Sequence, residues 1–303
     1  MPDRPYVYEV EGLSKKYKET SSSANTDISF HIREGEFFGL LGSNGAGKTT
    51  LIKQMLGLIR PDHGRVRLFG KDILTNPRFT THTVGYMPQN AFALNSLTVR
   101  EAVYFSAHLR GLSTRAARHQ RDECLQLLGL DHLATKVARQ LSGGERRLLQ
   151  LAVTLTGSPP VLVLDEPTNE LDPSRRRQVW TLLRQLNQRE GRTIVLITHN
   201  AVEAEQVIER VGILRDGALV ALGAPAELKA PLDSQVRLSF THPGTEAPVL
   251  PDYVRVHSCH RGKVVAFLSS ADVSKLAQEM DLTCFPEFTM NTATLEDVYI
   301  NYA

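Results

Sequence analysis

The sequence has few cysteines, no long apolar run and almost no excess of either charge. Its 303 residues include Cys124, Cys259 and Cys284 with no CxxC pair, which excludes a disulfide-stapled scaffold and a cysteine-based metal framework. No stretch reaches the roughly 18–20 consecutive apolar residues that a membrane-spanning helix requires. The first residues also lack the apolar segment of a secretory signal. We therefore expect a chain that is not itself embedded in a membrane and that works in a reducing compartment.

The charge balance narrows the class of partner. Lys and Arg number 35 against 33 Asp and Glu, a formal net charge of +2. A protein that binds nucleic acid through its phosphates usually carries a strongly basic domain, so none is expected as a partner here. The length and the 42% hydrophobic content favour one large domain and a smaller one.

Three short apolar runs each end in a cluster of polar residues. Residues 37–41 precede Gly42, residues 161–164 precede Asp165, and residues 193–197 precede Thr198 and His199. Apolar runs of this length between helical patterns are typical of buried parallel strands. Because ligands of open α/β sheets bind outside the carboxyl ends of the strands, we expect these three clusters to converge on one site.

Other segments complete the predicted fold. Helices are expected over residues 49–58, 97–109, 116–128 and 175–189, the last with Asp172 as N-cap and Pro173 in its first turn. Alternating residues 6–10, 28–32 and 66–69 predict an antiparallel sheet, and the Ser/Thr-rich residues 20–25 predict a surface loop. Beyond Pro225 the pattern predicts strands at 236–240, 254–256, 264–268 and 285–290, and helices at 272–280 and 295–302. We place a domain boundary at about residue 230.

A glycine-rich loop follows the first apolar run. The nine residues that we assign to nucleotide binding are Gly42, Ser43, Asn44, Gly45, Ala46, Gly47, Lys48, Thr49 and Thr50. The first eight match the P-loop (Walker A) pattern in full, in which backbone N–H groups and a helix N-terminus surround phosphate oxygens. Lys48 would contact the β- and γ-phosphates, and the Thr49 hydroxyl would coordinate Mg²⁺. A plain glycine-rich turn would explain a shorter match but not this one, so we predict binding of a nucleoside triphosphate.

Two further segments suggest what happens to the nucleotide. Asp165 stands where a Walker B aspartate holds Mg²⁺ through water, and Glu166 could deprotonate an attacking water. Taken alone, this pair would equally fit two solvated acids that open a loop. Ser142 and Glu145 form a capping box around Gly143 and Gly144. Two glycines in a first helical turn are unfavourable unless something must approach the backbone closely, which indicates a second phosphate-binding surface.

The order of these motifs resembles the nucleotide-binding domain of ATP-binding cassette (ABC) transporters. The resemblance covers about residues 6–229 and includes Gln89 and the segment that begins at Leu141. It implies an α/β fold: a P-loop NTPase core (residues 1–229) with an antiparallel β subdomain and a helical subdomain (about 90–155). A small C-terminal α+β domain (230–303) follows. It also implies ATP and Mg²⁺ as ligands, and two cassettes that pair head to tail.

The resemblance assigns roles residue by residue. Ser142, Gly143 and Gly144 would contact the ATP of the partner cassette, and Asp172 would couple the two sites. Gln89 resembles the glutamine that senses Mg²⁺ and the membrane partner, and it stands with Glu166 and His199 in the catalytic set. His199 resembles the histidine that contacts the γ-phosphate, although a lone His after a strand is more often structural. Tyr17 resembles the aromatic residue that stacks on adenine.

Two positions depart from the family pattern, and one segment suggests a branch of the family. Ser43 replaces a common proline, and Glu170 stands where a small residue or glycine is commoner. The C-terminal segment around Leu295 and Val298 resembles the ending of exporter ATPases of the antibiotic, multidrug and polysaccharide branch. A generic amphipathic last helix would share this pattern.

The resemblance implies a peripheral protein on the cytoplasmic face of the cell membrane, working as a homodimer or paired cassette with separate transmembrane permease subunits. The main alternative is a soluble cassette ATPase that acts on nucleic acid or ribosomes. Such proteins usually carry two cassettes or a long coiled-coil insertion. This chain has one set of motifs, and the gap between Lys48 and Ser142 is too short for such an insertion.

Overall fold

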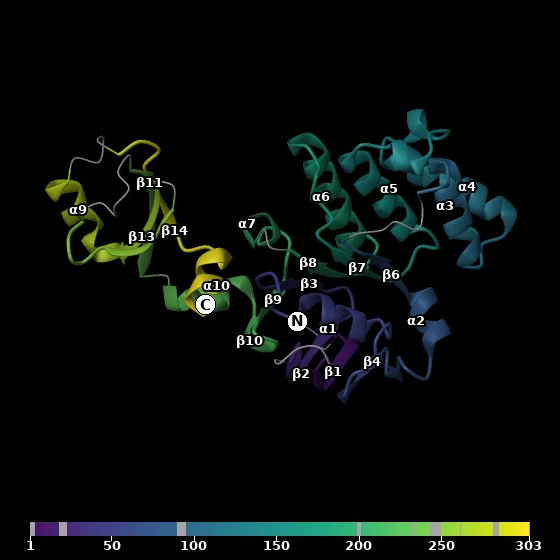
Figure 1. Ribbon diagram of the computed structural model, residues 1–303, viewed down its shortest axis with the longest axis horizontal. Helices are drawn as coiled ribbons and strands as arrows, with labels where there is room; N and C mark the ends of the chain where they lie inside the picture. The colour runs from purple at the N-terminus through teal and green to yellow at the C-terminus, as the bar shows by residue number, and fades with distance from the viewer. Residues whose placement is uncertain are drawn as a thin grey trace. The chain divides into compact units, whose positions relative to one another are not determined.

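The computed structural model describes residues 4–17, 23–89, 95–198, 201–232, 234–242, 250–260, 262–280 and 285–302. The chain folds as two compact units, Met1–Leu222 and Gly223–Ala303. Figure 1 shows the secondary structure elements of both. No helix among the described residues is long and apolar enough to cross a membrane.

A six-stranded sheet forms the centre of the first unit. Its strands are β3 (Phe37–Leu41), β6 (Val84–Met87), β7 (Val161–Asp165), β8 (Thr193–Ile197), β9 (Arg210–Arg215) and β10 (Ala218–Gly223). Their order is β10-β9-β3-β8-β7-β6, and β9, β3, β8, β7 and β6 pair in parallel. Every residue of β3, β7 and β8 is buried, which explains their continuous apolar sequences. The predicted buried parallel strands are confirmed.

A second sheet of the first unit is antiparallel. It contains β1 (Tyr6–Lys15), β2 (Asn25–Arg33), β4 (His63–Leu68) and β5 (Lys71–Asp72) in the order β2-β1-β4-β5. Helix α1 (Lys48–Met55) buries Leu51, Ile52 and Met55 in the hydrophobic core that both sheets share. This core holds α1, and with it the loop that precedes the helix, against β3.

One sequence expectation in this region is wrong. Residues 20–22 of the predicted surface loop lie outside the described residues, but Asn25 at its end is fully buried and begins β2. Its side-chain amide donates a hydrogen bond of 3.2 Å to the carbonyl oxygen of Gly47, at the start of α1. The polar side chain is therefore inside because it has a backbone partner there, which composition alone does not reveal.

Helices cover the rest of the first unit. They are α2 (Pro77–Thr83), α3 (Val99–Leu109), α4 (Thr114–Leu127), α5 (Gly143–Leu155), α6 (Pro173–Gln188) and α7 (Ala201–Ala204), with short 3-10 turns at Asp131–Leu133 and Ala138–Gln140. Figure 1 shows α3, α4 and α5 grouped on one side of this unit. The Asp172 carboxylate caps α6 by accepting bonds of 2.9 and 3.0 Å from the backbone of Ser174 and Arg175, as predicted. Helices α2 and α7 were not predicted, because neither shows apolar periodicity.

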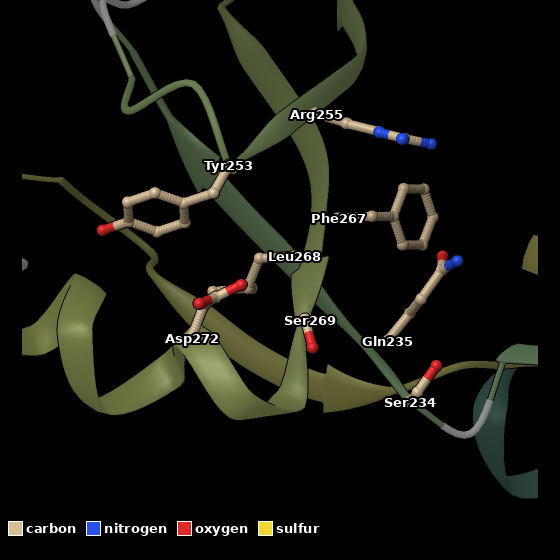
Figure 2. A pocket seen from close by; sticks show the side chains of 8 residues that line it. All are labelled: Ser234, Gln235, Tyr253, Arg255, Phe267, Leu268, Ser269 and Asp272. Atoms are coloured by element: carbon tan, nitrogen blue, oxygen red, sulfur yellow. The ribbon is translucent and has the colours of Figure 1, made fainter.

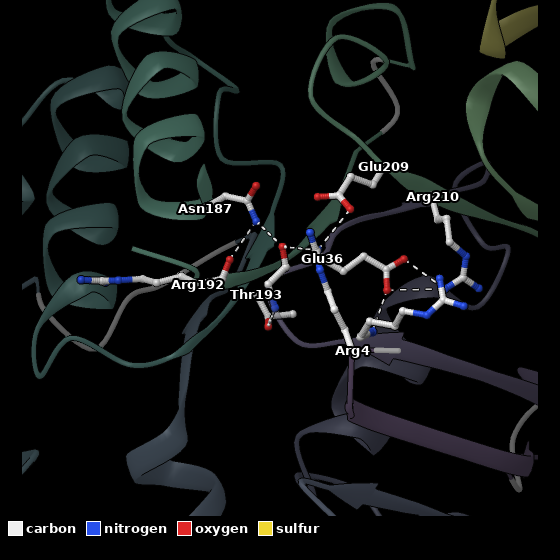
Figure 3. A network of polar contacts seen from close by, with 9 residues as sticks. Arg4, Glu36, Asn187, Arg192, Thr193, Glu209 and Arg210 are labelled. Atoms are coloured by element: carbon white, nitrogen blue, oxygen red, sulfur yellow. Dashed lines mark hydrogen bonds and ion pairs between the residues drawn. The ribbon is translucent and has the colours of Figure 1, made fainter. Parts of the chain in front are cut away.

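A network of paired polar groups lies at the amino-terminal ends of the parallel strands (Figure 3). Glu36, which is 2% exposed and precedes β3, accepts a bond of 3.0 Å from Arg210 at the start of β9. Asn187 of α6 donates to the carbonyl oxygens of Gly35 and Arg192 at 2.8 and 2.9 Å. The Thr193 hydroxyl accepts a bond from the backbone of Gly35. These hydrogen bonds connect β3, β8, β9 and α6 at the end of the sheet opposite the glycine-rich loop.

The second unit is a small α+β fold. Strands β11 (Gln235–Thr241), β12 (Arg255–His260), β13 (Lys263–Ser269) and β14 (Thr289–Thr292) form an antiparallel sheet in the order β12-β13-β11-β14. Its helices are α8 (Pro225–Lys229), α9 (Val273–Glu279) and α10 (Leu295–Tyr302), with 3-10 turns at Ala230–Leu232 and Ser270–Asp272. Leu238, Ala266 and Leu276 are central to its core. Strand β14 begins four residues later than the predicted strand.

A hollow of about 270 Å³ opens on the second unit (Figure 2). Tyr253, Arg255, Phe267 and Asp272 are among its lining residues. Tyr253 already has internal partners: its hydroxyl donates to Glu279 at 2.7 Å, and the ammonium group of Lys275 lies 4.3 Å from its ring centroid.

Candidate functional site

The glycine-rich loop leaves the carboxyl end of β3 and enters α1. Its glycines are required by close packing: a Cβ at Gly42 would lie 2.6 Å from the Leu214 carbonyl oxygen, and one at Gly47 would overlap the Ala24 carbonyl oxygen. Gly47 also has a φ of 98°, which side chains with a Cβ rarely adopt. The loop is therefore fixed from behind by β2 and β9. Ser43, Asn44, Gly45 and Thr49 are exposed on its outer side, while Ala46 is buried.

Lys48 folds back over this loop. Its ammonium group donates to the carbonyl oxygens of Gly42 and Ser43 at 2.6 and 2.9 Å. Partial burial lowers the pKa of Lys48, and the nearby carboxylates of Glu166 and Asp165 oppose that shift. The same cation therefore faces both the loop and the acid pair at the end of β7.

Two adjacent carboxyl groups lie at the carboxyl end of β7. Asp165 and Glu166 are 5% and 6% exposed. Burial raises the pKa of Asp165, and the neighbouring Glu166 raises it further, whereas Arg147 and Lys48 act in the opposite direction. Glu166 has a left-handed φ of 53°, and its carboxylate accepts a bond of 3.0 Å from the Thr198 hydroxyl at the end of β8. The expected convergence of the three strand ends is thus present for Lys48, Asp165, Glu166 and Thr198.

The sequence reasoning missed one residue of this site, Arg147 of α5. Its buried guanidinium donates to the backbone carbonyls of Asp165 and Glu166, and to that of Gln89 at 2.9 Å. It also donates to the Gln150 side chain at 2.8 Å. An arginine three positions after Gly144 gave no sign of burial, because arginine is usually exposed. The Arg147 guanidinium therefore links α5 to the acid pair after β7 and to the segment after β6.

The segment that begins α5 has the predicted capping box. The Ser142 hydroxyl accepts a bond of 3.3 Å from the Glu145 backbone, and the Glu145 carboxylate accepts one of 2.8 Å from the Ser142 backbone. Ser142 is exposed, and Gly143 and Gly144 are partly exposed. Among the described residues, no hydrogen bond joins these three to the glycine-rich loop of the same chain. They form a separate surface.

Three of the remaining predicted site residues lie at the surface. The Tyr17 hydroxyl lies 3.5 Å from the Thr50 hydroxyl at the start of α1, and the Tyr17 ring is partly exposed. Gln89 is exposed just beyond β6, with its backbone held by Arg147. Asp172 is exposed and caps α6. His199 lies outside the described residues.

Comparison with known proteins agrees with this geometry. The sequence profile of the ABC transporter family matches residues 25–169. The chain is 39% identical to a Nod factor export ATP-binding protein I of Paraburkholderia xenovorans (strain LB400), over 73% of this chain and 72% of that protein. This chain belongs to the ABC transporter family. The same fold, α/β with a P-loop core, is seen in the dimeric post-hydrolysis state of the ATP-binding cassette MJ0796 bound to ADP and Pi. That match has a TM-score of 0.67 and 26% identity over 72% of this chain and 98% of that one.

A second group of relatives is much longer than this chain. The retinal-specific phospholipid-transporting ATPase ABCA4 of Bos taurus is 33% identical over 98% of this chain, which spans only 14% of that protein. This ABC cassette is therefore an ATP-binding ATPase domain of the kind that occurs both as a chain of similar length and within a far larger protein.

Proposed function

We propose that this cassette hydrolyses ATP at the carboxyl ends of β3, β7 and β8. The observation that carries the proposal is the convergence of the phosphate loop, Lys48 and the buried pair Asp165 and Glu166. Lys48 would exchange its two loop carbonyls for phosphate oxygens. Glu166, which Thr198 orients, would accept a proton from the attacking water. Tyr17, beside Thr50, would stack on the adenine, and Gln89 and His199 would complete the catalytic set.

The residues present fit a magnesium ion. Mg²⁺ prefers oxygen ligands and is usually held by one or two protein groups together with substrate phosphates. The Asp165 carboxylate at the end of β7 and the exposed Thr49 hydroxyl at the start of α1 supply such oxygens, and Gln89 would add a third. When bound, the ion would neutralise charge on the phosphates.

We further propose that two cassettes pair head to tail, as a homodimer or with a related cassette. The phosphate loop and the surface at Ser142, Gly143 and Gly144 are separate within one chain, and each stands at a helix start, where backbone N–H groups and the helix dipole favour an anion. Pairing would place the ATP of one subunit against the Ser142 surface of the other, with Asp172 near the boundary. The dimeric structure of the cassette MJ0796 supports pairing of two cassettes.

Light scattering of Glu166→Gln tests the pairing. With slow hydrolysis, ATP should convert this variant from monomer to dimer, whereas ADP should not. Adding Ser142→Arg to the same chain places a bulky cation on the pairing surface. It should abolish the dimer and leave the ATP affinity of the monomer unchanged. ATP-dependent dimers of the double variant would contradict the assignment of Ser142.

The proposed physiological role is the energy-coupling subunit of an exporter whose transmembrane permease subunits are separate chains, at the cytoplasmic face of the cell membrane. The relatives named for Nod factor export support the export direction. Purification of the tagged chain in mild detergent tests this role. A membrane permease that co-purifies and changes the ATPase rate is the expected result. Ribosomes or nucleic acid in its place would favour the alternative of a soluble cassette ATPase.

A further inference from the structure

Glu170 has an unusual backbone conformation beside the pairing surface. It lies between the acid pair at the end of β7 and the Asp172 cap of α6, and its φ of 65° is in the left-handed region. Glycine adopts this region freely, whereas a residue with a Cβ rarely does. A glutamate held in this conformation needs surroundings that favour its side chain there.

The side chain of Glu170 lies against the first turn of α5. A Cβ built on Gly143 would overlap the carboxylate oxygen Oε2 of Glu170, and the carboxyl carbon would be 3.1 Å from that Cβ. A Cβ on Gly144 would lie 3.0 Å from the Glu170 backbone oxygen. The two glycines thus leave the space that Glu170 fills in the single chain.

The positive groups around this contact explain why the Glu170 carboxylate lies against the first turn of α5. The first turn of α5 presents backbone N–H groups and the positive end of the helix dipole, both of which attract a carboxylate. The Glu170 carboxylate also interacts with the buried guanidinium of Arg147 on the next turn of α5. Arg175 lies beside Gly144, and Lys136 lies 3.7 Å from the Glu145 carboxylate. The carboxylate of Glu170 therefore occupies a place where a phosphate would be attracted for the same reasons.

We propose that Glu170 is a built-in competitor for the phosphate-binding surface of α5, so that it weakens ATP-driven pairing of the cassettes. This inference rests on the head-to-tail pairing proposed above. Before the γ-phosphate of the partner's ATP can approach Gly143 and Gly144, the carboxylate must move away or repel it at close range. The competitor acts on pairing alone, because it does not line the phosphate loop of its own chain.

The test uses Glu170→Gln and Glu170→Gly in the Glu166→Gln background. Glu170→Gln removes the charge and keeps the side chain. Glu170→Gly also frees the backbone and empties the space next to Gly143. Glu287 also has a left-handed φ, 57°, and lies in the second unit, so Glu287→Gln and Glu287→Gly are matched controls. The readouts are the dimer dissociation constant in saturating ATP, by sedimentation, and the ATP affinity of the monomer, by calorimetry.

We expect Glu170→Gln to tighten the dimer about 2- to 5-fold, the usual effect of one charge near a helix N-terminus, and Glu170→Gly to tighten it at least as much. Monomer ATP affinity and both Glu287 controls should be unchanged. If Glu170 merely stabilised α5, its removal would weaken the dimer, and a weaker or unchanged dimer overturns the proposal. If the Glu166→Gln parent itself fails to dimerise with ATP, the pairing proposal fails first, and the Glu170 proposal fails with it.

Discussion

The two ends of the parallel strands in the first unit are built in opposite ways. At the amino-terminal end, Glu36 is buried against Arg210, and Asn187 satisfies two carbonyl groups (Figure 3). At the carboxyl end, Asp165 and Glu166 place two like charges side by side, and burial raises the pKa of Asp165. The first arrangement pairs its charged and polar groups with one another within the chain. The second leaves charge and N–H groups that a nucleotide can satisfy.

The largest expected effect is at the carboxyl end. Glu166→Gln removes the group proposed to accept the proton, so the ATPase turnover should fall by about 10²–10⁴-fold. The thermal midpoint should change little, because Gln keeps the shape of the side chain. A coupled ATPase assay with thermal melts measures both. The matched control is Glu209→Gln at the opposite end, which loses only an exposed pair with Arg4 and should keep normal turnover.

The next largest effect is expected at the amino-terminal end, where a substitution should lower stability and leave turnover unchanged. Glu36→Gln breaks the buried ion pair with Arg210 and leaves the guanidinium without its charge partner, which should lower the free energy of unfolding by about 3 kcal/mol. Turnover per folded molecule should remain normal, since the substitution lies at the far end of β3. Urea titration followed by an ATPase assay on the native fraction checks this. A large loss of turnover without destabilisation would show that the two ends are not separable.

Arg147→Lys should lower both the free energy of unfolding and the ATPase turnover. It keeps the positive charge beside the acid pair but loses the fork that holds the carbonyls of Asp165, Glu166 and Gln89. We expect a loss of about 2 kcal/mol in unfolding free energy and a fall of about tenfold in turnover, which corresponds to 1.4 kcal/mol in the barrier. ATP affinity should be retained. Unchanged turnover in this variant would mean that Arg147 is structural only.

The smallest effect is expected for Asn187→Ala at the amino-terminal end. The carbonyls of Gly35 and Arg192 lose a neutral donor, which should lower the unfolding free energy by about 1 kcal/mol. Both turnover and ATP affinity should equal those of the unmodified chain. Chemical denaturation resolves a change of this size, and a measurable fall in turnover would contradict the separation of the two ends.

The sequence predicts the carboxyl end better than the amino-terminal end for a physical reason. The phosphate loop and the acid pair follow buried strands directly, and parallel neighbours bring their ends together, so local patterns are sufficient. Arg147, Asn25 and the network around Glu36 depend on partners far along the chain. Asn25, for example, is buried because the Gly47 carbonyl lies opposite it. Chain periodicity carries no information about such pairs.

The ends of the helices and strands are also predicted well only where local sequence determines them. The predicted helices at residues 97–109 and 175–189 correspond to α3 (Val99–Leu109) and α6 (Pro173–Gln188), because caps and apolar spacing define them locally. Strand β14 (Thr289–Thr292) begins later than predicted, because its position follows from pairing with β11 rather than from its own composition. The assignment of residues 1–229 to a nucleotide-binding domain and of residues 230–303 to a small C-terminal domain stays a prediction.

The most direct test of the central claim is a mixing experiment with two inactive variants. Lys48→Ala lacks a working phosphate loop, and Ser142→Arg lacks a working pairing surface, so each alone should be inactive. In an equal mixture only the mixed pairs hold an intact composite site, one in each pair, so turnover should reappear at no more than half that of the unmodified chain. No recovered turnover in the mixture would show that the ATP site is not shared between two cassettes.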